Sequence, residues 1–146
     1  MKPDFAATAL SGEGARLYGG RWNPPGWRCV YAAESRALAM LELLVHLTGR
    51  SRALKFRLLT LEIDQAAVLE AKHLADGWNT HPAGRASQII GQNWLQDSKS
   101  PVLRVPSVLI PEESNFLLNP LAPGFDMIRV IEERELSLDL RLAESP

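Results

Sequence analysis

The chain has 146 residues, of which 46% are hydrophobic, and its 16 basic and 17 acidic residues give a net charge of −1. This length and composition predict one domain over residues 1–146, large enough to bury a core without disulfides or metals. The balanced charge argues against the basic patch that drives nucleic-acid binding, so we expect no direct contact with DNA or RNA.

The sequence also predicts where the protein acts. A single cysteine, Cys29, can form no intrachain disulfide, which suits a reducing cytosol. The longest apolar stretch, 37–47, is interrupted by Glu42 and is too short to span a bilayer. The apolar run near the amino terminus, 5–10, is short for a signal peptide. We therefore expect a cytoplasmic protein without membrane contact.

The chain begins with a lead-in, residues 1–18, that shows no sustained period of 2 or 3.6 residues. We expect a loop there, with a short strand near Phe5. Gly19 and Gly20 then precede Arg21, and a Pro-Pro-Gly turn follows at 24–26. Glycine and proline together predict a tightly bent backbone that holds the Arg21 side chain in place.

A short apolar strand over 28–33, which carries Tyr31, follows this turn. Ser35 is then a plausible N-cap and Gly49 a plausible stop for a helix of three to four turns. Ten residues separate Arg21 from Tyr31 and span at most about 3.3–3.6 Å each. Arg21, Tyr31 and the helix can therefore converge.

Glu42 is the anomaly of this helix, because it is the only charged residue in 37–45. An unpaired carboxylate is costly to bury, or its pKa rises. Ser35, Ala39 and His46 fall on the same side of the helix at helical spacing. Glu42 could therefore lie on the solvated stripe of an amphipathic helix or serve a buried site.

The middle of the chain predicts a strand and a second helix. Residues 54–63 place apolar residues first at even and then at odd positions, a slip that indicates a bulge or a strand buried on both faces. Residues 64–79 predict a loop with at most one short helical turn. Pro82 then begins a helix that ends near Gln96 and packs an isoleucine and tryptophan face on the sheet.

The last third predicts further strands. Pro106 lies inside the apolar run 102–110, which indicates an edge or a bulge because proline cannot donate to the ladder, and Ser107 is presented at this break. Residues 115–120 predict a strand closed by an Asn-Pro turn. From Met127 we expect two alternating pieces with four leucines facing inward: Leu136, Leu138, Leu140 and Leu142.

These elements sum to an α+β fold with mostly antiparallel strands and two principal inserted helices. His46, His73 and His81 are scattered and lack acidic or cysteine companions at ligand spacing, so we expect no metal site.

Five separated motifs, in this order and spread over about 11–142, resemble the RES domain family. They are Gly19-Gly20-Arg21-Trp22-Asn23, Val30-Tyr31-Ala32-Ala33-Glu34-Ser35, Leu41-Glu42-Leu43-Leu44-Val45-His46, Val105-Pro106-Ser107 and Asn115-Phe116-Leu117-Leu118-Asn119-Pro120. The family takes its name from an Arg, a Glu and a Ser, which match Arg21, Glu42 and Ser107. RES proteins are toxins of bacterial toxin–antitoxin pairs that act on NAD, and their fold is similar to that of ADP-ribosyltransferase toxins.

The resemblance implies an ADP-ribosyltransferase-like split sheet and an NAD site in which the catalytic residues are Glu42, Arg21, Tyr31 and Ser107. It implies that NAD is bound by Arg21, Tyr31, Gly20, Trp22 and Asn119. Trp22 and Asn23 either line the pocket or support the turn, and Asn119 is either a turn former or a ligand contact.

The residue types fit this chemistry. Cleavage of the bond between nicotinamide and ribose passes through an oxocarbenium-like state, which a carboxylate such as Glu42 stabilises. The fork of donors on Arg21 suits a diphosphate. The ring of Tyr31 can stack on nicotinamide.

Three functions compete. The first is hydrolysis of NAD, which depletes the cofactor and arrests growth; the second is transfer of ADP-ribose to an acceptor protein; the third is a non-catalytic nucleotide-binding domain. Met40 stands where many transferases have a second acidic residue, two positions before the catalytic glutamate, and this favours water as the acceptor. The resemblance also implies an antitoxin partner with a helix-turn-helix region of the Xre type.

Overall fold

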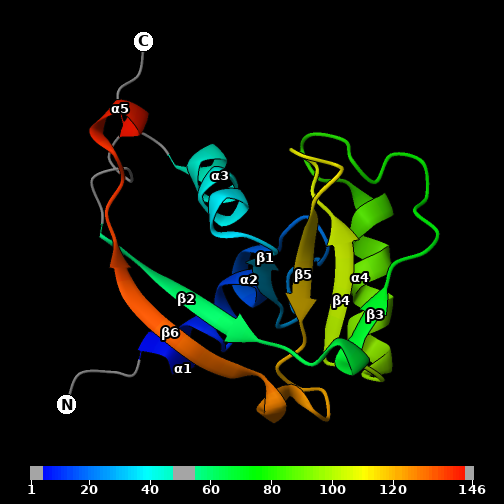
Figure 1. Cartoon of the computed structure of the whole chain (residues 1–146). Coiled ribbons are helices and arrows are strands. Elements are labelled where there is room, and N and C mark those ends of the chain that lie inside the picture. The colour runs from blue at the N-terminus through cyan, green and yellow to red at the C-terminus, as the bar shows by residue number, and fades with distance from the viewer. Residues whose placement is uncertain (1–4, 48–54, 144–146) are drawn as a thin grey trace.

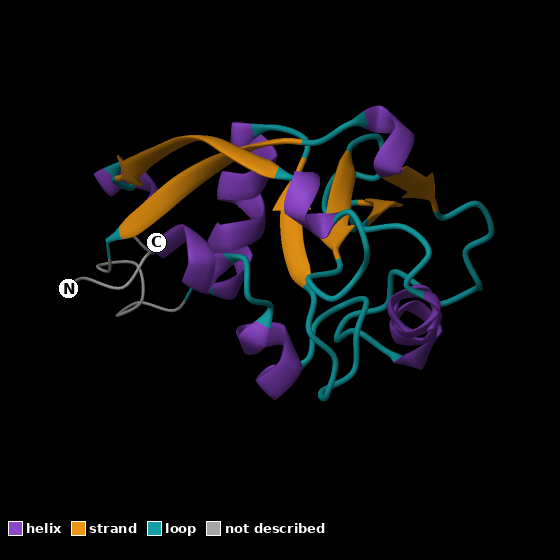
Figure 2. Ribbon diagram, turned by 90° about the horizontal axis from the view of Figure 1, so that it is seen from below, coloured by secondary structure: helices purple, strands orange, loops and turns teal. Residues whose placement is uncertain are grey.

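The computed structural model describes residues 5–47 and 55–143, and these residues form two separate sheets with helices inserted between the strands (Figure 1). The first sheet has the strand order β1-β5-β4-β3, and the second is a two-stranded ribbon of β2 and β6. In Figure 2 the ribbon and the four-stranded sheet are distinct groups of strands. The strands are β1 (Val30–Ala33), β2 (Phe56–Glu62), β3 (Val68–Glu70), β4 (Val102–Pro106), β5 (Ser114–Leu118) and β6 (Arg129–Leu136).

The pairing is mostly antiparallel, as the sequence predicted. β1 with β5, β5 with β4, and β2 with β6 are antiparallel, and only β3 with β4 is parallel among the described strands. The strand β3 was not predicted, because three residues are too few to show an alternating period; the helical turn Gln65–Ala67 just before it fits the expected single turn. The register of β2 and β6 shifts between Thr60 and Leu61, but the unpaired residue there is Ile131 of β6, so the bulge predicted within 54–63 is not in that strand. β2 is instead partly buried on both faces, which was the alternative prediction.

Pro106 ends β4 at an unpaired edge. β3 stops where Glu70 pairs with Arg104, so no strand lies beside Pro106 on that side among the described residues. On the other side Pro106 pairs with Ser114 of β5. The predicted break is therefore present, and Ser107 is the first residue after the end of β4.

The helix of Glu42 is α3 (Arg36–His46), and the Ser35 side chain caps it by accepting from the Leu38 amide at 3.1 Å. The predicted N-cap is confirmed, whereas the predicted stop at Gly49 lies outside the described residues. The second helix, α4 (Arg85–Asp97), begins three residues after Pro82, with Gly84 at the N-cap position, so the predicted start at Pro82 is wrong.

The ends of the described chain differ from the prediction. The lead-in forms two helices, α1 (Phe5–Ala9) and α2 (Glu13–Tyr18), so the expected strand near Phe5 is wrong. The last expected strand piece is replaced by α5 (Leu140–Ala143), where the Asp139 side chain accepts from the Arg141 amide at 2.9 Å. Leu142 is accordingly 43% exposed and does not face a core. Helices of four to six residues are too short to show a helical apolar period.

Two apolar clusters cover the two faces of the four-stranded sheet. On one face α4 packs Trp94 and Leu95 against Leu103, Val105 and Leu117 of the central strands. On the other face a smaller cluster lies under the ribbon, and Figure 1 shows α4 and the ribbon on opposite sides of the sheet. Its buried members and their partly buried neighbour from β2 are Val30, Val102, Leu118 and Leu61.

Candidate functional site

Glu42 is held by two donors from the four-stranded sheet and the loop that follows β4. Its Oε1 accepts from Ser107 Oγ at 2.8 Å and from Asn115 Nδ2 at 2.8 Å. The carboxylate is therefore fixed against the sheet, and the alternative of a free, solvated stripe does not describe it. Both donors reach the same oxygen, and no described donor reaches Oε2.

Ser107 is fully buried, and its hydroxyl both accepts and donates hydrogen bonds. Its Oγ accepts from the amides of Leu109 and Ile110, both at 3.1 Å. A hydroxyl has two acceptor sites and one proton, so with both acceptor sites used the proton is directed to Glu42. Ser107 thus orients the carboxylate of Glu42 by donating to its Oε1.

Asn115 is the second donor, and the sequence analysis placed it in a strand and in the fifth motif without giving it a role in the site. It is the second residue of β5 and pairs with Ala33 on one side and Val105 on the other. Its Oδ1 is buried and has no hydrogen-bond partner among the described residues. The signal that could have found it is a polar residue two positions ahead of the apolar pair Leu117 and Leu118.

The glycine turn is closed by Asn23. The Gly20 amide donates to the Asn23 carbonyl at 2.9 Å. The fully buried side chain of Asn23 donates through Nδ2 to the carbonyls of Ala15 and Pro24, both at 3.0 Å, and Trp27 at 3.2 Å. Asn23 therefore supports the turn and does not line a pocket.

Tyr31 is anchored to the same turn by its hydroxyl. Tyr31 Oη accepts from the Trp22 amide at 3.1 Å and donates to Asn23 Oδ1. Burial raises the pKa of Tyr31 above its ordinary value, so the phenol stays protonated and able to donate. Gly20 is required here because a Cβ would lie 2.6 Å from Tyr31 Oη. The residue remains 40% exposed.

Arg21 has no acidic partner among the described residues. Its Nη1 donates to the main-chain carbonyls of Thr80 at 2.7 Å and Trp78 at 3.2 Å. Neutral carbonyls orient the guanidinium without cancelling its charge. A partly buried, oriented and uncompensated cation of this kind is suited to binding an anion.

The pairing of β1 with β5 shows how Tyr31 lies relative to Asn115, the donor to Glu42. Tyr31 pairs with Leu117 and Ala33 pairs with Asn115, so Tyr31 and Asn115 are on the same face of the sheet. Tyr31, which is bonded to the glycine turn, and Asn115, which is bonded to Glu42, are therefore at neighbouring positions of β1 and β5.

Comparison with known families and proteins identifies the chain. The RES domain profile matches residues 1–140. The chain belongs to the RES domain family. The Prs ADP-ribosylating toxin of Sphingobium sp. (strain YBL2) is 41% identical over 143 residues, which cover 94% of this chain and 89% of that relative. Toxin Res of Yersinia enterocolitica is 37% identical over 141 residues, which cover 94% of this chain and 93% of that relative.

The third relative is MbcT of Mycobacterium tuberculosis, named an NAD(+) phosphorylase. It is 39% identical over only 69 residues, or 42% of this chain and 37% of MbcT. The solved M. tuberculosis MbcT–MbcA toxin–antitoxin complex matches with a TM-score of 0.70 at 24% identity, covering 88% of this chain and 78% of that chain. This likeness concerns the fold, and it confirms the predicted α+β class.

Two of the predicted residues are not brought together with Glu42, Ser107 and Asn115 in this RES domain. Trp22 is 2% exposed and stacks on Trp78 with ring centroids 5.8 Å apart, so its side chain belongs to the core. Asn119 is 2% exposed at the opposite end of β5 from Asn115. Its Oδ1 accepts from the Leu121 amide at 3.0 Å, and its Nδ2 donates to the carbonyl of Leu95 at 3.1 Å and to Ser98 Oγ at 3.2 Å.

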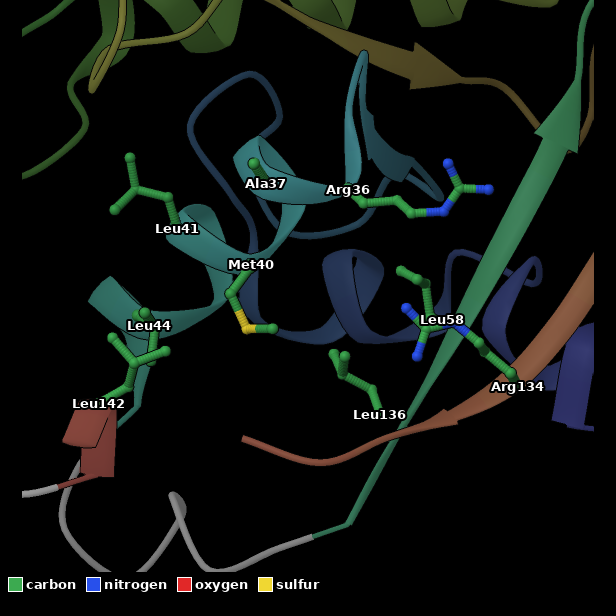
Figure 3. Close-up of a pocket in the computed structure, with 9 residues that line it drawn as sticks. All are labelled: Arg36, Ala37, Met40, Leu41, Leu44, Leu58, Arg134, Leu136 and Leu142. Carbon is green, nitrogen blue, oxygen red and sulfur yellow. The ribbon is translucent and has the colours of Figure 1, made fainter. Parts of the chain in front are cut away.

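The RES domain also has an apolar groove of about 350 Å³ on the side of α3 that faces β2 and β6. It lies between α3, the ribbon and α5, and Figure 3 shows Met40 on the groove side of α3, pointing toward Leu136. Met40 is therefore in the groove lining, whereas Glu42 of the same helix bonds to the sheet. The lining residues are Arg36, Ala37, Met40, Leu41, Leu44, Leu58, Arg134, Leu136 and Leu142.

Within residues 5–47 and 55–143, no three His, Cys, Asp or Glu side chains are grouped as metal ligands. In the same residues no helix has the length and apolar character needed to cross a bilayer.

Proposed function

We propose that this RES domain, as a single domain, is the toxin of a bacterial toxin–antitoxin pair and cleaves the bond between nicotinamide and ribose in NAD. The observation that carries the proposal is the carboxylate of Glu42, held on one oxygen by Ser107 and Asn115 with the other oxygen free of described donors. The names of the relatives support the same substrate and the same biological role.

In this mechanism the bond from ribose C1 to the nicotinamide nitrogen breaks, and its electron pair leaves with nicotinamide, which becomes neutral. Positive charge develops on the ribose ring. Glu42 stabilises that charge through Oε2, since its Oε1 is used by two donors and its geometry is set before the reaction. Ser107 and Asn115 are positioning residues in this step.

Arg21 and Tyr31 bind the two ends of the nucleotide. The charge of Arg21 is not cancelled by a described acid, so it is available to the diphosphate. Tyr31 is pinned at its hydroxyl while 40% of the residue remains exposed, so its ring can stack on nicotinamide. Gly20 allows the hydroxyl of Tyr31 to approach the turn.

Water is the acceptor that we propose. The position two before Glu42 is Met40, which lines the apolar groove, so it supplies no second carboxylate for an acceptor nucleophile. Attack by water on ribose C1 gives ADP-ribose and one proton. NAD depletion would then arrest growth of the cell that makes the toxin, in its cytoplasm.

A protein acceptor is the second candidate, and one observation favours it. The relative that is 41% identical over 94% of this chain is named a Prs ADP-ribosylating toxin. In this reaction a side-chain nucleophile replaces water at ribose C1, and the ADP-ribose remains attached to the target.

The acceptor is tested by incubating the purified protein with NAD in three parallel reactions: buffer alone, added inorganic phosphate, and added Prs protein. Free nicotinamide measures bond cleavage, and mass spectrometry identifies ADP-ribose, its phosphate ester or modified Prs. We expect nicotinamide and ADP-ribose in buffer alone. Release that requires Prs would favour transfer, release that requires phosphate would favour phosphorolysis, and no release in any reaction would refute the proposed substrate.

The proposed partner is an antitoxin with an Xre-like helix-turn-helix region, which would supply the DNA contact. MbcT, whose fold this chain shares, was solved in a toxin–antitoxin complex with MbcA, and this supports a partner of the antitoxin class. Expression of this chain should arrest growth, and co-expression of the neighbouring gene of its operon should restore it. Isolation of the chain alone after expression of the whole operon would contradict this proposal.

A further inference from the structure

Three consecutive carbonyls of the glycine turn face one helix, α4. The Gly20 carbonyl accepts from Gln88 Nε2 at 3.1 Å, and the Arg21 carbonyl accepts from Ser87 Oγ at 2.6 Å. The Trp22 carbonyl lies over Gly91, where a Cβ would come within 1.7 Å of the oxygen. The helix α4 therefore contacts these carbonyls through two side-chain donors, Ser87 and Gln88, and through Gly91, which has no side chain.

The contacts are on one face of α4. Gly91 is four positions after Ser87 and three after Gln88, so it lies one helical turn further along the same side of α4, between the two donors. Ser87 and Gly91 are both buried, whereas Gln96, further along the helix, is exposed. The turn lies directly against the first two turns of α4.

The side chain of Arg21 is held by the segment that leads into the same helix. Its Nη1 donates to the carbonyls of Trp78 and Thr80, which precede α4 in the chain. Main chain and side chain of Arg21 are thus fixed by one continuous segment, 78–91. Glu42 is held separately, by Ser107 and Asn115.

We propose that Ser87, Gln88 and Gly91 are positioning residues that set the direction of the Arg21 guanidinium and so determine the affinity for the NAD diphosphate. The inference rests on the proposed NAD site. An oriented cation gains more from a bound anion than one that must first be ordered, because less conformational freedom is lost on binding. Loss of these contacts should weaken NAD binding and leave the step at Glu42 unchanged.

The test compares Ser87→Ala and Gln88→Met with Gln96→Met. Ser87 is fully buried and cannot touch NAD, so any effect of its loss on affinity acts through the turn. Gln88→Met removes the donor at similar length and adds no charge, and Gln96→Met makes the same change at an exposed position of α4. The measurements are KM and kcat for nicotinamide release, and the Kd of NAD in the Glu42→Gln background, where chemistry is suppressed.

We expect KM and Kd to rise about tenfold in Ser87→Ala and Gln88→Met, because one hydrogen bond to the turn is lost, with kcat unchanged. Gln96→Met should match the wild type. A lower melting temperature without a change in KM in both site variants would show a purely structural role and overturn the inference. If Ser87→Ala does not fold, Gln88→Met alone decides. Wild-type protein that binds no NAD would refute the proposed function and the inference together.

Discussion

Replacing Ser107 with alanine should damage both the fold and the reaction. The buried hydroxyl accepts from the partly buried amides of Leu109 and Ile110 and donates to Glu42. Alanine leaves both amides without that acceptor and Glu42 with Asn115 as its one described donor. A fully buried group that loses its partner costs about 1–3 kcal/mol; the two amides are only partly buried, but two amides and a carboxylate each lose a partner, so we take about 2 kcal/mol for this site. At about 2.1 cal/mol/K per residue, this loss lowers Tm by about 6–7 °C in a chain of this length.

The assay for Ser107→Ala is thermal unfolding together with nicotinamide release. Ser137→Ala is the matched control, since Ser137 is exposed and makes no described side-chain hydrogen bond. We expect the control to be silent and Ser107→Ala to lower kcat about tenfold, because a carboxylate with one donor is less well oriented and tenfold corresponds to about 1.36 kcal/mol. If Ser107→Ala has the same Tm and the same kcat as Ser137→Ala, the Ser107 hydroxyl does not make the hydrogen bonds described.

Two further predictions concern stability. Burial raises the pKa of Cys29 to about 12 from an ordinary value of 9.0, so the stability it contributes is complete below pH 9 and is lost as pH rises toward 12. Between pH 8 and pH 10 the free energy of unfolding in urea should therefore fall by about 1.4 kcal/mol more in the wild type than in Cys29→Ala. An equal fall in both proteins would contradict the burial of the thiol. Gly91→Ala should cost about 2–3 kcal/mol despite the higher helix propensity of alanine, because its Cβ would meet the Trp22 carbonyl. Gly14→Ala in α2, where a Cβ meets nothing within 4 Å, should be neutral or stabilising, and similar Tm values for the two variants would refute the close contact.

The parts of the fold that could be predicted are those with strong local signals. Ser35 caps α3 because a serine before an apolar helical run offers its oxygen to the first free amides. The partial burial of both faces of β2 follows from the change of apolar positions from even to odd between Leu58 and Leu59. The break at Pro106 follows from the missing amide of proline.

The parts that could not be predicted depend on distant contacts or on elements that are too short. Ser87 and Gln88 reach the turn across 66 and 68 positions of the chain, and no local pattern marks them as its support. Asn115 is identified by its bond to Glu42, 73 positions away. α1, α2, α5 and β3 have three to six residues each, which is below the length at which a period can be recognised.

Two residues that the resemblance assigned to NAD binding have buried side chains that bond or pack away from Glu42, Ser107 and Asn115. A motif identifies positions in the sequence, but it does not show where each side chain points. Trp22 follows Arg21 directly and yet turns into the core against Trp78, and Asn119 uses its amide to join β5 to the end of α4. Their expected contact with NAD is not supported by these positions, and we expect their loss to affect stability first.

The central claim, that Glu42 stabilises the charge developing on ribose, is tested most directly by the turnover of Glu42→Gln. Both Ser107 and Asn115 donate to one oxygen of Glu42, and the amide oxygen of glutamine can accept the same two bonds, so the fold should be retained. We expect an unchanged Tm, NAD binding within about twofold of the wild type, and a loss of nicotinamide release of about 10²–10³-fold, the scale for one charge-stabilising group. A folded Glu42→Gln protein that releases nicotinamide at the wild-type rate would contradict the mechanism.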